Sequence, residues 1–261
     1  MSIWDSLSVW EALAILAAGI GAGTINTIVG SGTLITFPVL LATGLPPVTA
    51  TVSNALGLVP GSLSGAIGYR EELRGQGRRV RTLAVAAAVG GVTGAVLLTL
   101  LPPTAFETIV PVLVALALVL VVLQPRISAA VRRRERRGTA SGAADVGPAL
   151  FCGLLLASVY GGYFTAAQGI LYLSLMGMLL NDTLQRLNAV KNVLAAIVNS
   201  IAALFFLFVA DFDWAAVLLI AVGSAAGGQI GAKVGRRLPP AVLRTVIVVV
   251  GVSAIVQLLL R

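Results

Sequence analysis

The sequence has no histidine, one cysteine and few charged side chains. Only 11% of its 261 residues are Asp, Glu, Lys or Arg, whereas about a quarter of an ordinary globular domain is charged. Without histidine the chain lacks the commonest metal ligand and a frequent general base, and its single cysteine, Cys152, cannot form an internal disulfide. Because no pair of acidic residues falls inside an apolar segment either, we expect no enzyme activity, no metal and no cofactor.

Long apolar segments make up most of the chain. Hydrophobic residues account for 58% of it, and a helix that crosses a bilayer core needs about 20 of them in succession. Such runs cover residues 80–101, 104–123, 184–210, 214–234 and 241–260. The alternating pattern of a membrane barrel is absent. The sequence therefore predicts an all-α polytopic membrane protein, and its net charge of +8 is assigned to membrane topology and not to nucleic acid.

The basic residues are clustered, and the clusters predict which loops are cytoplasmic. Five Lys or Arg lie at 70–81, six lie at 126–137, and a third cluster surrounds the turn at 233–244. By the positive-inside rule all three face the cytoplasm, and RRRERR in the second cluster is expected to be a solvated loop. The turns at 100–108 and 210–214 contain acidic residues and no Lys or Arg. These turns and both chain termini are therefore expected on the outer side.

One part of the sequence repeats another at a constant spacing. AVGGVTGAVLLTLLPPTAFET at 88–108 aligns without gaps to AAGGQIGAKVGRRLPPAVLRT at 225–245, an offset of 137 residues. Carried upstream, this offset pairs Gly32 with Gly169. The alignment predicts a first transmembrane repeat at 1–123, a basic cytoplasmic linker at 124–147 and a second repeat at 148–261, each with about five helical segments.

The charge pattern gives the two repeats opposite orientations. The first LPP turn is predicted outside, whereas the second follows two arginines and is predicted inside. Halves related by an axis in the membrane plane are typical of secondary transporters that work by alternating access. A duplication without any role in transport is the alternative.

Each repeat begins with two segments that do not resemble ordinary membrane spans. Segments 9–29 and 33–43 are joined by GSG, and segments 148–164 and 169–180 are joined by TAAQ. The second member of each pair has about a dozen residues, which reach across roughly half of a bilayer. We expect discontinuous or re-entrant helices whose breaks lie near the middle of the membrane, where irregular backbone is tolerated if it lines a cavity or contacts protein.

The residues around these breaks are candidates to bind an anion, because a helix N-terminus presents free N–H groups and a partial positive charge. The candidates are Asn26, Thr27, Gly30, Ser31, Gly32 and Thr33 at the first break, Tyr163, Gln168 and Gly169 at the second, and Ser53, Asn54, Asn188, Lys191 and Asn192 on the third segments. Lys191 lies inside an apolar segment, where a basic side chain is functional by default. The alternatives are that the small residues only allow close packing, and that Lys191 reaches toward the cytoplasmic face.

Several runs of the sequence resemble one family of membrane proteins. GAGTINTIVGSGTLITFPVLL, the following PPVTATVSNALGLVPGSLSGAIGYREEL, and YGGYF, LNAVKNVLA and GGQIGA in the second half are similar to the TauE/SafE family of membrane anion exporters. The resemblance covers almost the whole chain and implies export of sulfite or a small organosulfonate such as sulfoacetate. Where the family has a glycine-rich run after YGGYF, this chain has TAAQG, which makes Gln168 a candidate substrate contact.

The residues and the resemblance together predict a transporter for a small oxyanion. The anion would bind between the two helix breaks, and Lys191 would balance its charge. An anion channel is one alternative, and export of a different small anion, such as thiosulfate or a carboxylate, is another. The expected partners are the anionic substrate and the lipid bilayer, with a second copy of the chain as a candidate partner in a homodimer.

Overall fold

The computed structural model describes residues 7–136, 146–234, 248, 249 and 252, and within these ranges the chain is helical without strands. Ten helices follow one another along the described chain. They are α1 (Val9–Ile28), α2 (Thr33–Ala42), α3 (Pro47–Gly57), α4 (Val59–Gly68), α5 (Gly77–Leu100), α6 (Pro103–Arg136), α7 (Pro148–Phe164), α8 (Gln168–Leu179), α9 (Leu184–Val209) and α10 (Trp214–Val234). The predicted all-α fold is confirmed.

Five of these helices are long and apolar enough to cross a membrane, namely α1, α5, α6, α9 and α10. Large apolar side chains remain exposed on outward faces, among them Val112, Leu156, Phe208 and Val222. Exposure of this kind is expected where the surroundings are lipid chains and not water. Four of the predicted spans are confirmed as helices, while the fifth, at 241–260, lies outside the described residues apart from 248, 249 and 252.

The segment expected to be a basic loop is helical in its first part. Helix α6 continues through Pro125 to Arg136 and has 34 residues, which corresponds to about 51 Å. The loop prediction ended the helix at residue 123 because proline and clustered arginines interrupt the apolar run. Arginine, alanine and glutamate are nevertheless good helix formers, so the chain keeps its helical conformation beyond the apolar run.

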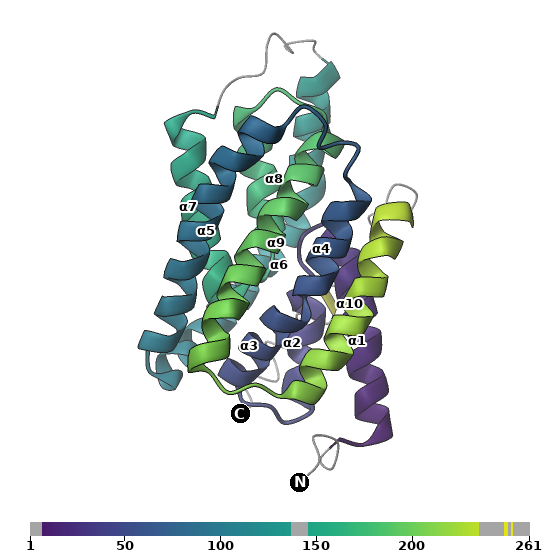
Figure 1. Ribbon diagram of the computed structural model, residues 1–261, viewed down its shortest axis with the longest axis vertical. Coiled ribbons are helices and arrows are strands. Elements are labelled where there is room, and N and C mark those ends of the chain that lie inside the picture. Colours follow the sequence, from purple (N-terminus) through teal and green to yellow (C-terminus); the bar gives the residue numbers. More distant parts are fainter. Residues whose placement is uncertain (1–6, 137–145, 235–247, 250–251, 253–261) are drawn as a thin grey trace.

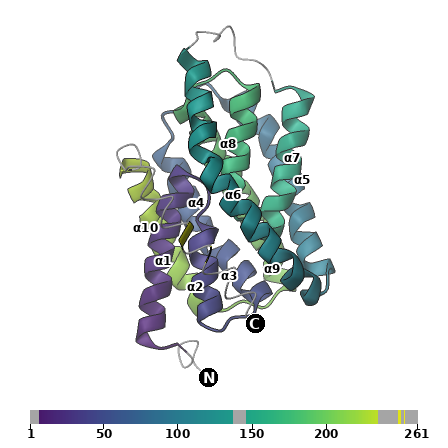
Figure 2. The same ribbon diagram turned by 180° about the vertical axis from the view of Figure 1, so that it is seen from behind.

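The helices form two bundles that lie side by side (Figure 1). The first bundle contains α1, α2, α3, α4 and α10, and the second contains α5, α7, α8 and α9, with α6 covering α8 on the far side (Figure 2). The closest pairs are α1 with α10 and α5 with α7. Glycines allow these close approaches, since a Cβ on Gly227 would lie 2.1 Å from the Ile20 carbonyl oxygen and a Cβ on Gly94 would lie 2.1 Å from that of Val159.

Corresponding helices of the two predicted repeats run in opposite directions. Helix α1 ascends in Figure 1 whereas α7 descends, and α5 descends whereas α10 ascends. Opposite directions are what an inverted repeat requires, although the repeat itself stays a prediction. The loop between α4 and α5, the end of α6 and the end of α10 all lie at the top of Figure 1, and we call this part of the molecule the basic end.

Candidate functional site

The first helix break lies between α1 and α2, where Gly30 changes the direction of the chain. Gly30 has a φ of 92°, which glycine adopts without steric cost. Its carbonyl oxygen accepts a hydrogen bond of 3.1 Å from the backbone N–H of Gly169. A Cβ on Gly30 would lie 2.4 Å from the Gly169 Cα. The two predicted breaks therefore meet, backbone against backbone, inside the protein.

The second break, between α7 and α8, is made without a glycine at its turning points. Thr165 and Ala167 adopt φ angles of 61° and 56°. The predicted ends of the four broken segments agree with the structure to within one residue at each end. The N-cap positions are Gly32 in the first pair and Ala167 in the second. This spacing matches Gly32 to Ala167, two positions before the Gly169 that the offset of 137 suggested.

The side chain of Ser31 at the first break is buried without a hydrogen bond to any described residue. It is completely buried, and its Oγ has no hydrogen-bond partner among the described residues. The first backbone hydrogen bonds of α2 are donated by Leu34 and Ile35, to the carbonyls of Ser31 and Gly32. The amides of Gly32 and Thr33 precede this pattern and belong to the unpaired donors of a helix N-terminus. Gly32 has no side-chain cap that could satisfy them.

Helix α9 holds the end of α1 through three side chains. Lys191 Nζ donates to the carbonyl oxygens of Asn26 at 3.1 Å and Thr27 at 3.0 Å. The Nδ2 atoms of Asn188 and Asn192 also donate to the Thr27 carbonyl, each at 3.3 Å. Lys191 is completely buried and does not reach toward the membrane surface. Its aliphatic stem passes the second break, because a Cβ on Gly169 would lie 3.0 Å from Lys191 Cδ.

This arrangement changes the electrostatic field at the first break. The C-terminal end of α1 carries a partial negative charge of about half an electron, which would repel an anion. The ammonium of Lys191 lies on those carbonyls and outweighs that partial charge. The N-terminal end of α2 contributes a partial positive charge to the same break. The break is consequently favourable to an anion.

Asn54, a candidate site residue on α3, is in contact with the first turn of α2. Its Nδ2 donates to Thr33 Oγ1 at 3.1 Å, and its Oδ1 accepts a short hydrogen bond from Thr36 Oγ1. All three side chains are buried. This network ties α3 to α2 directly beside the break.

Three other predicted site residues, Ser53, Gln168 and Tyr163, make contacts away from the first break. Ser53 Oγ accepts from the backbone N–H of Asp213, before α10, so it points away from the break. Gln168 folds back on its own helix and donates to Tyr172 OH, which shares a hydrogen bond of 2.7 Å with Ser158 Oγ. Tyr163 lies against Phe106, with 5.6 Å between the ring centroids, and its buried hydroxyl has no partner among the described residues.

Two further polar residues join the site without having been selected from the sequence. Ser62 Oγ, on α4, accepts from the Nδ2 atoms of Asn26 at 3.3 Å and Asn199 at 3.0 Å. The Oδ1 atom of Asn199 is buried without a partner in the described part of the chain. The signal for Asn199 was present, because it follows Asn192 by seven residues and therefore lies on the same face of α9. Ser62 offered no such signal, since serine is common in membrane helices.

Within the described ranges, no three His, Cys, Asp or Glu residues lie close enough to hold a metal ion. The site instead consists of hydroxyls, amides, one ammonium and helix ends, buried between membrane helices. Such a set of donors, with discontinuous helices meeting inside a bundle, defines the class of polytopic membrane transporters.

Comparisons with known proteins identify the family within this class. The model for the family described as "Sulfite exporter TauE/SafE" matches residues 15–258, so the chain belongs to that family. It is 27% identical over 239 residues to "Probable membrane transporter protein YfcA" of Escherichia coli K12, which is 91% of this chain and 86% of the relative. It is 26% identical to "Probable membrane transporter protein ORF9" of a Sinorhizobium species, over 91% of this chain and 88% of that protein. No solved structure matches the chain. The protein is therefore a multi-pass membrane transporter.

Proposed function

We propose that this transporter exports a small oxyanion, sulfite or a small organosulfonate such as sulfoacetate. The anion binds at the first helix break, between the N-terminal end of α2 and the second break. The family description "Sulfite exporter" supports the chemical class of the substrate. The donors around the break suit an oxyanion, which accepts hydrogen bonds in several directions and carries its charge on several oxygens.

The observation that carries this proposal is the buried, unpartnered hydroxyl of Ser31. A buried polar group without a partner costs about 1–3 kcal/mol, so it is usually retained for a reason. Here it lies beside the free amides of Gly32 and Thr33, at a helix end that attracts anions. Binding of an oxyanion would satisfy the hydroxyl and both amides together.

The electrostatic potential at the break has the sign that attracts an anion. Both hydrogen bonds of Lys191 Nζ are donated to α1, so the lysine compensates the negative end of that helix and the anion is not repelled by it. Lys191 then acts on the substrate through its charge, without direct contact in this conformation. Export needs little additional energy, because a membrane potential of about 100 mV moves a single negative charge outward with about 2.3 kcal/mol.

The direction of transport follows from the orientation that the sequence predicts, with the basic end in the cytoplasm. Alternating access is supported by the opposite directions of α1 and α7 and by the matched packing of α1 on α10 and α7 on α5. The contact between Gly30 and Gly169 closes the space between the breaks. A rocking movement of the two bundles would have to separate these residues to release the anion.

The proposal is tested by measuring flux in proteoliposomes. Sulfite, sulfoacetate, thiosulfate and a carboxylate are offered to the purified protein, with and without an imposed potential. We expect saturable flux and counterflow for at least one sulfur oxyanion. Ser31→Ala should raise the KM roughly tenfold, because one charge-assisted hydrogen bond contributes about 1.5 kcal/mol or somewhat more. It should not lower the thermal stability of the anion-free protein, because it removes a buried hydroxyl that has no partner among the described residues.

Ser174→Ala is the matched control, because Ser174 Oγ already donates to the Ile170 carbonyl within α8, away from the break. Equal KM values for the Ser31 and Ser174 variants would contradict a binding role for Ser31. Flux that grows without saturation toward the rate of ion diffusion, and shows no counterflow, would favour the anion channel over the carrier.

A further inference from the structure

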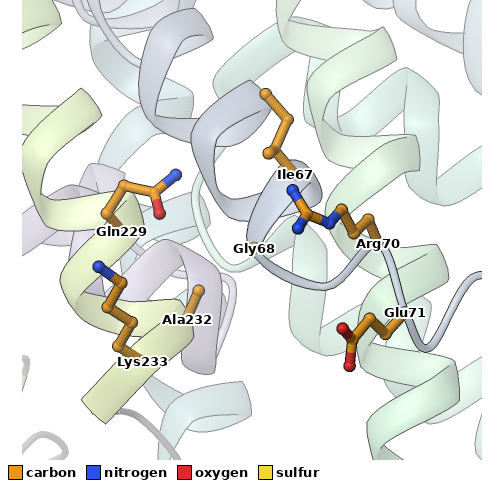
Figure 3. A pocket seen from close by; sticks show the side chains of 7 residues that line it. All are labelled: Ile67, Gly68, Arg70, Glu71, Gln229, Ala232 and Lys233. Atoms are coloured by element: carbon orange, nitrogen blue, oxygen red, sulfur yellow. The ribbon is translucent and has the colours of Figure 1, made fainter.

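A cavity of about 460 Å³ opens at the basic end, between the end of α4 and the last turn of α10. Figure 3 shows its polar side chains on two sides, with Gln229 and Lys233 on α10 and Arg70 and Glu71 just after α4. This cavity lies outside the set of residues that surrounds the helix breaks. Its volume is ample for a small anion together with several water molecules.

Three charged side chains of this cavity have no ion-pair partner among the described residues. Arg70, Glu71 and Lys233 are exposed and form no ion pair within the described part of the chain. The nearby Arg79 and Arg186, by contrast, both bind Asp182, at 2.6 and 2.9 Å. Among the described residues the cavity is lined by two cations and one carboxylate, which gives it a surplus of positive charge.

The contact between Gly68 and Ala232 forms the floor of the cavity, and the first break lies a short distance beyond it. Gly68 packs on Ala232, whose Cβ would lie 2.2 Å from a Cβ on Gly68. Three residues earlier on α4, Gly65 packs in the same way on Thr27, whose carbonyl oxygen holds Lys191. Three residues of helix span about 4.5 Å. The cavity thus lies about one helical turn above the end of α1, on the same line of contacts between α4 and its neighbours.

We propose that this cavity is a recruitment site, where a sulfite or sulfonate anion binds between Arg70 and Lys233 before it enters the membrane. The inference rests on the proposed function for the identity of the anion. Positive charge gathered in a recess raises the local concentration of an anion and the rate of its capture. Opening of the contact between Gly68 and Ala232 would then give the anion access toward Thr27 and the break.

The charge of the cavity is measured by thiol labelling, independently of transport. Ile67→Cys, in a Cys152→Ser background, places one thiol in the cavity wall, and the protein is held in nanodiscs of pure phosphatidylcholine. Its reaction rates are compared for an anionic sulfonatoethyl and a cationic trimethylammonioethyl methanethiosulfonate. Adding Arg70→Gln and Lys233→Gln should lower the ratio of anionic to cationic rates by roughly tenfold. Glu71→Gln should raise the same ratio, and Arg81→Gln, outside the cavity, should leave it unchanged.

The transport arm uses everted membrane vesicles, in which the cytoplasmic face is accessible. Arg70→Gln with Lys233→Gln should raise the KM for the exported anion several-fold with little change in kcat, and Glu71→Gln should lower that KM. Opposite shifts from opposite charge changes would not arise from a general loss of folding. A changed labelling ratio with an unchanged KM would overturn recruitment and leave the proposed export standing.

A phospholipid headgroup could occupy the same cavity, since its phosphate shares the charge of the substrate. Nanodiscs with added phosphatidylglycerol distinguish the two sources. If the preference for the anionic reagent persists there and free sulfoacetate slows the labelling, the site takes free anions. If phosphatidylglycerol alone removes the preference, the cavity is a lipid site and the inference is wrong. Absence of saturable flux from the unmodified protein, with the labelling result intact, would count against the proposed function only.

Discussion

The two helix breaks touch each other at Gly30 and Gly169, yet they are constructed differently. The first turns on a glycine with a positive φ, whereas the second turns on Thr165 and Ala167 with similar positive angles. A residue with a Cβ pays roughly 1–2 kcal/mol for this left-handed conformation. The second break is therefore strained where the first is relaxed, and its conformation must be maintained by the packing of α7 and α8 around it.

The polar groups at the two breaks differ in the same direction. The first break keeps Ser31 Oγ without a partner, and its C-terminal carbonyls are covered by Lys191. At the second break Gln168 is already bound to Tyr172, which is bound in turn to Ser158. Tyr163, near the second break, also has a buried hydroxyl without a partner among the described residues. In the proposed function the first break binds the anion, and the second forms the wall against which the first closes.

The largest effect is expected from Gly30→Ala, which inserts a methyl group into the close contact between the breaks. The new Cβ would lie 2.4 Å from the Gly169 Cα, and the alanine would have to adopt a φ of 92°. We expect the free energy of unfolding to fall by about 3–5 kcal/mol and all transport to be lost. Thermal unfolding in detergent and proteoliposome flux measure the two losses.

Gly44→Ala provides the matched control for this substitution. Gly44 also has a positive φ, of 88°, but no atom lies within 4 Å of a Cβ built there. The free energy of unfolding of this variant should fall by only about 1–2 kcal/mol, because backbone strain is the sole cost. Equal losses at the two positions would mean that the contact between Gly30 and Gly169 contributes nothing beyond the backbone angle.

Lys191→Met should have the next largest effect, chiefly on transport. The variant keeps the apolar stem but restores the uncompensated negative end of α1, so flux should fall by roughly tenfold or more. Asn188→Leu removes one donor to the same Thr27 carbonyl without a change of charge, and it should reduce flux far less. Similar flux for both variants in proteoliposomes would show that hydrogen bonding, and not charge, is what Lys191 supplies.

The smallest effect is expected from Ala167→Gly at the second break. Glycine relieves the left-handed strain but increases the conformational entropy of the unfolded chain. The net result should be a change of stability within about 1 kcal/mol, with an unchanged KM. The thermal midpoint and the KM for the exported anion test it, and a several-fold shift in KM would mean that the second break also shapes the binding site.

The sequence predicted the broken helices better than it predicted the contacts between them. Glycine, proline and hydroxyl residues interrupt the apolar runs, so the ends of α1, α2, α7 and α8 could be predicted from the sequence. The partner of Lys191 was not, because it is a pair of backbone carbonyls, which every residue possesses. The interaction of Gln168 with Tyr172 also escaped, although their separation by four residues places them on one helix face.

The packing of α1 against α10 determines when the first bundle can form during synthesis. These helices are far apart in the sequence, and α1 is inserted long before the ribosome reaches Trp214. Until then the glycine face of α1 that later receives α10 remains without its final partner, whereas Lys191, which donates to two carbonyls of α1, is synthesised earlier with α9. The first bundle is consequently completed only after α10 has been synthesised, later than the residues of the proposed anion site, which lie between Asn26 and Asn199.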